Sequence, residues 1–132
     1  IINGFLNLSQ DYLETLDEIK SLGDRKDEFS SGYLQVRANR QNRNISYGSI
    51  NYIESMSDYV LIRTIDNEAI MTRETITRIE QYLPDSFLRI HRSFIVNLAN
   101  VDSFTREYIL ISDKELPISR TYRKKVFELL KM

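Results

Sequence analysis

The two most informative stretches of this chain are RIHRSFIVN at residues 89–97 and LPISRTYR at residues 116–123. In both, apolar residues typical of β-strands stand next to cationic side chains. Both stretches also place an arginine next to a serine: Arg92 precedes Ser93, and Arg120 follows Ser119. A guanidinium group can bind guanine or phosphate through two parallel hydrogen bonds, and a serine hydroxyl adds one neutral bond. The two stretches therefore predict strands whose ends are suited to bind nucleic acid.

Short β-type runs make up most of the chain around these stretches. They are rich in Ile, Val, Tyr and Thr, and polar residues separate them. The predicted strands are residues 33–37, 50–54, 59–65, 69–72, 87–90, 94–98, 101–104, 108–111 and 115–118. Turns that interrupt them are expected at residues 39–44, 56–58 and 66–67. This order predicts a meander of antiparallel strands in a mainly β domain.

A helix is predicted at the N-terminal end of the chain. Asn7 can cap it, with Gln10 reaching back, and Gly23 follows its last turn. Its apolar stripe comes from side chains three or four residues apart: Leu8, Tyr12, Leu16 and Ile19. Residues 23–32 are polar and unpatterned, as expected of a linker. The chain therefore divides into an N-terminal helix with a polar linker, residues 1–31, and a mainly β domain, residues 32–132.

Two further helices are expected within the β-rich part. Thr72 can cap a helix over residues 73–82, which stops before Pro84. The last helix begins after Ser119, and four cations occupy its first turns: Arg120, Arg123, Lys124 and Lys125. The positive end of the helix dipole disfavours cations there, whereas the exposed backbone N–H groups favour phosphate. The pattern indicates a phosphate-binding helix start, and the alternative is a solvated helix that packs its apolar face in the core.

Charge is distributed unevenly along a chain whose net charge is −1. Residues 1–31 hold seven acidic and three basic side chains, whereas residues 86–132 hold nine basic and five acidic ones. A local basic face can bind phosphate even when the whole protein is nearly neutral. This distribution favours an acidic N-terminal segment that stays away from nucleic acid and a C-terminal part that binds it.

Several function classes are not expected. The sequence has no cysteine and one histidine, so no disulfide framework, metal site or other cofactor is predicted. It contains neither a glycine-rich phosphate loop nor a GxSxG or HExxH motif, so catalysis is not expected. It also lacks an apolar run long enough to span a membrane. These observations predict a cytoplasmic binding protein and not an enzyme.

Residues 87–97 resemble the signature of the LytTR family of bacterial DNA-binding domains. Further pieces follow in that family's order at residues 50–55, 58–60, 76–84 and 117–120, so the resemblance covers most of residues 32–130. It implies a mainly β, α+β fold, an elongated stack of small antiparallel sheets with short flanking helices. It also implies that loops and strand ends recognise DNA, in place of a recognition helix.

The resemblance also implies which side chains contact DNA. The segment around Arg92 would enter the major groove, with Arg92 contacting DNA directly and His91 orienting it or binding phosphate. Arg120 matches the arginine that the family places on DNA. The loop at residues 56–58 matches a DNA-contacting loop of the family, although many members have glycine where Ser57 stands. The predicted DNA-binding set is Ser57, Tyr59, His91, Arg92, Ser93, Ser119, Arg120, Arg123 and Lys124.

Two structural expectations concern the same region. If a strand continues through Ser93, then His91 and Ser93 point to one face and Arg92 to the other, unless a turn breaks the strand there. Asn97 is expected to fix a turn through its side chain.

The expected function is sequence-specific binding of duplex DNA for transcription regulation. The resemblance implies the output domain of a two-component or membrane-sensor regulator, with a receiver or sensor domain preceding this chain. The N-terminal helix is expected to connect the domain or to form a homodimer, or else to pack on the domain's own sheets. The alternative function is a protein–protein interaction module without DNA binding, in which the eight Tyr and six Phe residues form the partner surface.

Overall fold

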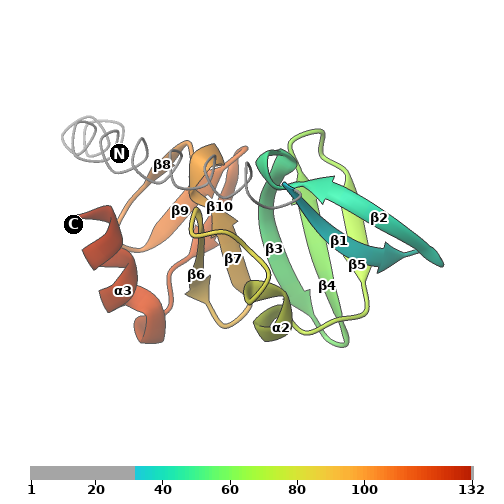
Figure 1. Cartoon of the computed structure of the whole chain (residues 1–132). Coiled ribbons are helices and arrows are strands. Elements are labelled where there is room, and N and C mark those ends of the chain that lie inside the picture. Colours follow the sequence, from blue (N-terminus) through green and yellow to red (C-terminus); the bar gives the residue numbers. More distant parts are fainter. Residues whose placement is uncertain (1–31, 132) are drawn as a thin grey trace.

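The computed structural model describes residues 32–131 of the chain (Figure 1). The predicted N-terminal helix lies outside these residues. The strands of the described part are β1 (Tyr33–Ala38), β2 (Gln41–Ser46), β3 (Ile50–Met56), β4 (Tyr59–Thr64), β5 (Ala69–Thr72), β6 (Phe87–His91), β7 (Phe94–Asn97), β8 (Ser103–Phe104), β9 (Tyr108–Ile111) and β10 (Lys114–Pro117). The helices are α2 (Ile76–Glu80) and α3 (Arg120–Leu130), with short 3-10 turns η1 (Tyr47–Ser49) and η2 (Leu98–Asn100). Neither α-helix of this part is long and apolar enough to span a lipid bilayer.

The strands form three antiparallel sheets arranged side by side, which gives the described part an elongated shape (Figure 1). The central sheet has five strands in the order β5-β4-β3-β7-β6, and the other two sheets are the β1–β2 hairpin and the three-stranded sheet β10-β9-β8. This arrangement confirms the predicted mainly β, α+β class. The central sheet is not a simple meander, however, because β7 pairs with β3. As a result, the β3–β4 turn and the β6–β7 turn lie at the same end of the central strands.

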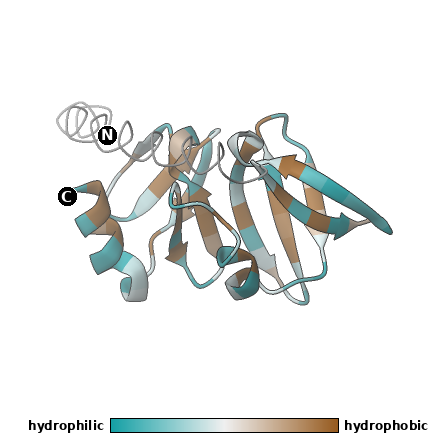
Figure 2. Ribbon diagram, viewed as in Figure 1, coloured by the Kyte–Doolittle hydropathy of each residue, from teal (hydrophilic) through white to brown (hydrophobic). Residues whose placement is uncertain are grey.

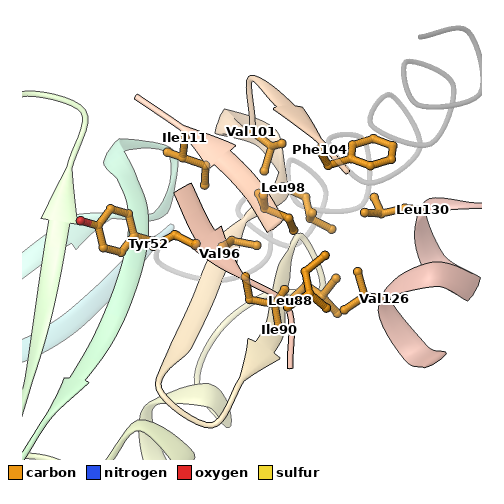
Figure 3. Packing of buried hydrophobic residues seen from close by; sticks show 13 residues of the cluster. Tyr52, Leu88, Ile90, Val96, Leu98, Val101, Phe104, Ile111, Val126 and Leu130 are labelled. Carbon is orange, nitrogen blue, oxygen red and sulfur yellow. The ribbon is translucent and has the colours of Figure 1, made fainter. Parts of the chain in front are cut away.

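Two hydrophobic clusters hold the sheets together, one on each face of the central sheet. Ile53 belongs to the cluster shared with the β1–β2 hairpin and α2. On the other face, Ile90 and Val96 pack with the three-stranded sheet and with Val126 and Leu130 of α3 (Figure 3). Hydrophobic residues are accordingly concentrated along the central strands (Figure 2). Each fully buried side chain of this size contributes about 1.5–3 kcal/mol to the free energy of folding. The two clusters therefore fix how the sheets pack together, and with them the positions of the turns at the end of the central strands.

Strand β2 is missing from the sequence prediction, which expected a turn at residues 39–44. Its sequence, QNRNIS, is polar, and Ile45 is the one residue of this strand that is buried. The turn is shorter than predicted, because it consists of Asn39 and Arg40, whose φ angles of 52° and 64° suit a tight two-residue hairpin. The prediction was wrong because β2 pairs its backbone with β1 along its whole length, and such a strand does not need an alternating apolar face.

The second helix is shorter than predicted and begins at a different residue. Thr75 caps α2, since its hydroxyl accepts a hydrogen bond from the backbone N–H of Arg78 at 3.2 Å. Thr72 instead ends β5, and its hydroxyl donates to the carbonyl of Arg37 at 2.7 Å. Threonine is a common N-cap residue, so the sequence alone did not distinguish Thr75 from Thr72, and the prediction of Thr72 as the cap was wrong. The other strand predictions agree with the structure to within two residues at each end, and α3 begins after Ser119 as predicted.

Candidate nucleic-acid interface

Three segments that carry predicted site residues lie along one edge of the domain, the lower edge in Figure 1. The β6–β7 turn is attached to β3, because the backbone N–H of Ser55 donates to the carbonyl of Ser93 at 2.8 Å. The start of α3 is attached to β6, because the backbone N–H of Ser119 donates to the carbonyl of Ile90 at 2.9 Å. We call these segments, residues 56–59, 91–93 and 119–124, the loop edge. The structure thus brings together all nine residues of the predicted set along one edge.

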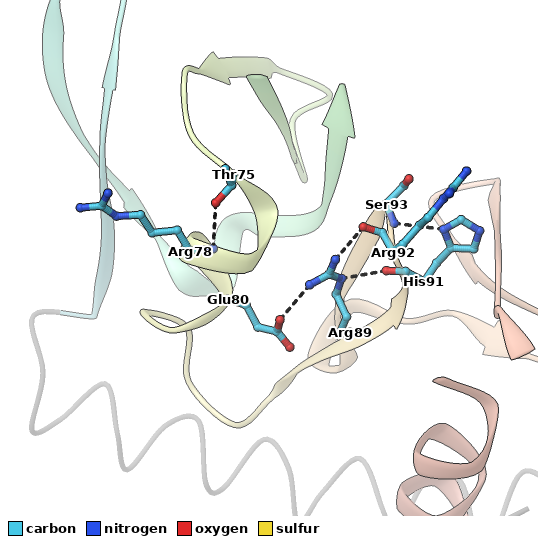
Figure 4. Close-up of polar contacts among 7 residues, drawn as sticks. All are labelled: Thr75, Arg78, Glu80, Arg89, His91, Arg92 and Ser93. Carbon is cyan, nitrogen blue, oxygen red and sulfur yellow. Dashed lines mark hydrogen bonds and ion pairs between the residues drawn. The ribbon is translucent and has the colours of Figure 1, made fainter. Parts of the chain in front are cut away.

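The β6–β7 turn forms the centre of the loop edge. Strand β6 ends at His91 and β7 begins at Phe94, so Arg92 and Ser93 occupy the turn. The pairing of the two strands shifts between Arg89 and His91, an irregularity that bends a strand end. Side-chain alternation along a continuous strand therefore does not apply to His91 and Ser93. The side chain of Arg92 is exposed and extends away from Arg89 (Figure 4).

The turn is built around a buried arginine. The guanidinium of Arg89 donates from Nε to the carbonyl of His91 at 2.8 Å and from Nη2 to the carbonyl of Arg92 at 2.6 Å (Figure 4). Its Nη1 donates to Oε1 of Glu80 at 2.9 Å, and the ring of Tyr122 lies 5.5 Å from the guanidinium carbon. Only 8% of Arg89 is exposed, so it supports the turn from inside. The predicted site omitted Arg89, and alternation along the strand provides no signal of its burial, because the apolar neighbours Leu88 and Ile90 point to the opposite face.

His91 is held as a neutral imidazole. Its Nδ1 accepts a hydrogen bond from the backbone N–H of Ser93 at 3.0 Å (Figure 4). An accepting Nδ1 carries no proton, so the proton of the neutral ring is on Nε2, which can donate. Burial lowers the pKa of His91 below its usual value, and the charges of Arg92 and Arg89 lower this pKa further. At neutral pH His91 is therefore a hydrogen-bond donor without a positive charge.

The start of α3 combines cations with incompletely bonded polar atoms. Ser119 is the N-cap residue, but its hydroxyl makes no capping hydrogen bond. The Oγ of Ser119 and the Nε of Arg123 are buried and have no hydrogen-bond partner among residues 32–131. Leaving such groups unbonded costs about 1–3 kcal/mol each. Arg120 and Lys124 are exposed beside them, and with Phe127 and Glu128 these cations line a shallow hollow. The exposed Arg120 and Lys124 thus make the helix start suited to bind an anionic group.

The β3–β4 turn occupies the far end of the loop edge. Ser57 has a φ of 57°, in the left-handed region that glycine adopts more readily than serine. The turn thus has a conformation typical of glycine, and holding serine in this conformation costs on the order of 1 kcal/mol. Met56 and Tyr59, which pair across the turn, are each 42% exposed. Ser57 and Tyr59 are therefore accessible at the same edge as Arg92.

The cations of the loop edge are available to an external partner. Within residues 32–131, salt bridges join Arg43 to Glu68, Arg78 to Glu74, and Arg89 to Glu80. Over that same part of the chain, no salt bridge occupies Arg92, Arg120, Arg123 or Lys124. Unpaired guanidinium and ammonium groups along one edge attract phosphate and can form charge-assisted hydrogen bonds with it.

The fold and the loop edge define a class of protein: a mainly β domain that presents cations on turns and at a helix start. Residues 40–131 match the model of the LytTr DNA-binding domain family. Because this match covers more than half of the sequence, the chain belongs to the LytTr DNA-binding domain family. The resemblance found in the sequence is thereby confirmed.

Individual relatives agree with this assignment. The chain is 33% identical over 95 residues to the sensory transduction protein LytT of Bacillus anthracis, covering 67% of the chain and 38% of that relative. It is 36% identical over 86 residues to the protein of the same name from Bacillus subtilis, covering 60% of the chain and 35% of that relative. The chain thus spans less than half the length of these relatives. A solved LytTr DNA-binding domain from Bacillus cereus has the same fold, with a TM-score of 0.65, 22% identity, and coverage of 78% of this chain and 100% of that one.

Proposed function

We propose that this domain binds duplex DNA sequence-specifically through the loop edge, with the β6–β7 turn in the major groove. The observation that carries the proposal is the β6–β7 turn, where the exposed Arg92 stands beside the donor His91, on one edge with the cations of α3. The width of the major groove admits a secondary-structure element, and its base edges form a pattern that side chains can distinguish. A protruding two-stranded turn with an arginine at its tip suits that groove.

The loop-edge residues would have different roles. Arg92 would read a base, because a guanidinium can bond both O6 and N7 of guanine. His91 and Ser93 would donate to nearby acceptors on base edges or phosphate. Arg120, with Ser119, would contact DNA at the helix start, and the neighbouring Arg123 and Lys124 would bind phosphates. Ser57 and Tyr59 would contact the backbone on the other side of the turn.

The proposed biological role is transcription regulation as the output domain of a sensory regulator. The relatives named above are sensory transduction proteins that are much longer than this chain, which supports an additional receiver or sensor domain in the whole protein. Residues 1–31 would form a separate unit that connects or dimerises the domain without contacting DNA. Deleting residues 1–29 should then leave binding to a single half-site intact. Loss of half-site binding or of folding would place this segment in the core.

A selection from random duplexes tests the proposal. The expected result is enrichment of a defined sequence, followed by binding of that cognate duplex that weakens steeply as salt rises, because each phosphate contact releases counterions. Absence of enrichment together with salt-insensitive or undetectable binding would reject sequence-specific recognition. It would favour the protein–protein alternative, in which exposed side chains such as Met56, Tyr59 and Met71 form the contact surface.

A further inference from the structure

We propose that Arg89 and Glu80 are positioning residues for DNA recognition. They hold the β6–β7 turn in the one shape in which His91 and Arg92 can meet DNA together. This inference rests on the proposed function of the loop edge and deepens it, because it identifies what sets the geometry of the contact. Neither residue would touch DNA.

Two carbonyl groups of the β6–β7 turn are hydrogen-bonded by one side chain. The carbonyls of His91 and Arg92 both converge on the guanidinium of Arg89, at 2.8 and 2.6 Å. Two carbonyl groups that point to the inside of a turn orient the backbone so that the intervening side chain of Arg92 can point outward, as Figure 4 shows. The guanidinium donates to these two carbonyls and to Glu80 from three separate nitrogens held in one plane. A lysine ammonium also has three donors, but all are on one nitrogen, so lysine cannot hold the three acceptors in the same positions. The shape of the turn therefore depends on an arginine at position 89.

Arg89 also connects the turn to both neighbouring helices. It bonds Glu80 of α2 at 2.9 Å, and it lies against the ring of Tyr122 of α3 at 5.5 Å. The side chain of Arg89 is only 7% exposed. It needs a charged partner, because an unpaired buried charge is strongly unfavourable. Glu80 is that partner. A change at Glu80 would therefore reach the turn through Arg89.

The charge on Glu80 has the same sign as the charge on DNA. Its side chain is 39% exposed and lies near an edge that we expect to meet phosphate. A carboxylate there repels DNA, so simple electrostatics predicts that removing its charge strengthens binding. Positioning predicts the opposite result for the cognate sequence. The two explanations can thus be separated by one substitution.

The experiment compares Glu80→Gln with a matched control, Glu74→Gln, by fluorescence anisotropy on cognate and random duplexes at two salt concentrations. Glu74 also pairs with an arginine, Arg78, at 3.7 Å, but that pair does not reach the turn. We expect Glu80→Gln to lose cognate affinity by about fivefold, from a weakened charge-assisted bond, and to bind random duplex at least as well as wild type. Glu74→Gln should keep the wild-type ratio of cognate to random affinity. Cognate binding by Glu80→Gln as tight as that of wild type, or tighter, would overturn the proposal.

A second variant, Arg89→Lys, separates positioning from a merely structural role. It keeps the charge, so the slope of log affinity against log salt should stay the same while the preference for cognate duplex falls. Well below the unfolding temperature, the NMR amide shifts of Arg92 and Ser93 in the free protein should change. A folded Arg89→Lys protein with the wild-type sequence preference would refute the positioning role. A wild-type protein that shows no sequence preference would refute the proposed function itself, which the variants do not test.

Discussion

Replacing Asn97 by alanine should strongly destabilise the strand that supports the β6–β7 turn. Asn97 is 2% exposed, and its amide donates to the carbonyls of Tyr47 at 3.1 Å and Ile50 at 2.8 Å. Its Oδ1 accepts from the N–H of Ala99 at 3.1 Å. Each bond contributes about 0.5–1.5 kcal/mol net, so losing all of them should cost about 3 kcal/mol. The cost should not be much larger, because another donor keeps the Ile50 carbonyl bonded, the amide of Asn100 at 3.0 Å.

Urea unfolding of wild type and Asn97→Ala would measure this loss as a shift of the midpoint at constant slope. Asn100→Ala is the matched control, because its amide bonds two carbonyls at a more exposed site. We expect the control to lose about 1 kcal/mol, since water can replace bonds to solvent-accessible groups. If Asn97→Ala lost less free energy of unfolding than Asn100→Ala, the reasoning from buried hydrogen bonds would be refuted.

Three further predictions concern the loop edge. Arg92→Ala should remove about 1–3 kcal/mol of discrimination between cognate and random duplexes. Equal losses of affinity for both duplexes would mean that Arg92 contacts only phosphate. Arg123→Ala or Lys124→Ala should each lower the slope of log affinity against log salt by about one, whereas an unchanged slope for both would make them ordinary surface charges. Because burial lowers the pKa of His91 from 6.5, the unfolded state takes up the proton first as pH falls. The free energy of unfolding should therefore decline below that value, and a decline of the same size in His91→Gln would rule out His91 as the cause.

The sequence predicted most of the fold because most strands have an apolar face to bury. Strand β9, for example, alternates buried Ile109 and Ile111 with more exposed neighbours, and its predicted bounds are those of the structure. Strand β2 could not be found in this way, since Ile45 is its one buried residue and its other side chains are polar, while its backbone pairs with β1 along its whole length. The pairing of β7 with β3 is a long-range contact that no local pattern records.

The candidate site was predictable for exposed residues and less so for the residues that support them. Cations next to hydroxyl groups at the ends of strands indicated Arg92 and Arg120 without knowledge of the fold. The role of Arg89 depends on Glu80, nine residues earlier in the chain, and on a turn that satisfies its donors. Asn97 was correctly expected to fix a turn, which is η2, although its bonds to Tyr47 and Ile50 join segments far apart in sequence.

The most direct test of the central claim is an NMR titration of the backbone amides with the selected cognate duplex. If the loop edge binds DNA, the largest shifts should fall on residues 56–59, 91–93 and 119–124, and random duplex should perturb mainly the cationic helix start. Shifts concentrated at the opposite edge, around the β4–β5 turn and η2, or identical shifts with both duplexes, would contradict sequence-specific recognition through the loop edge.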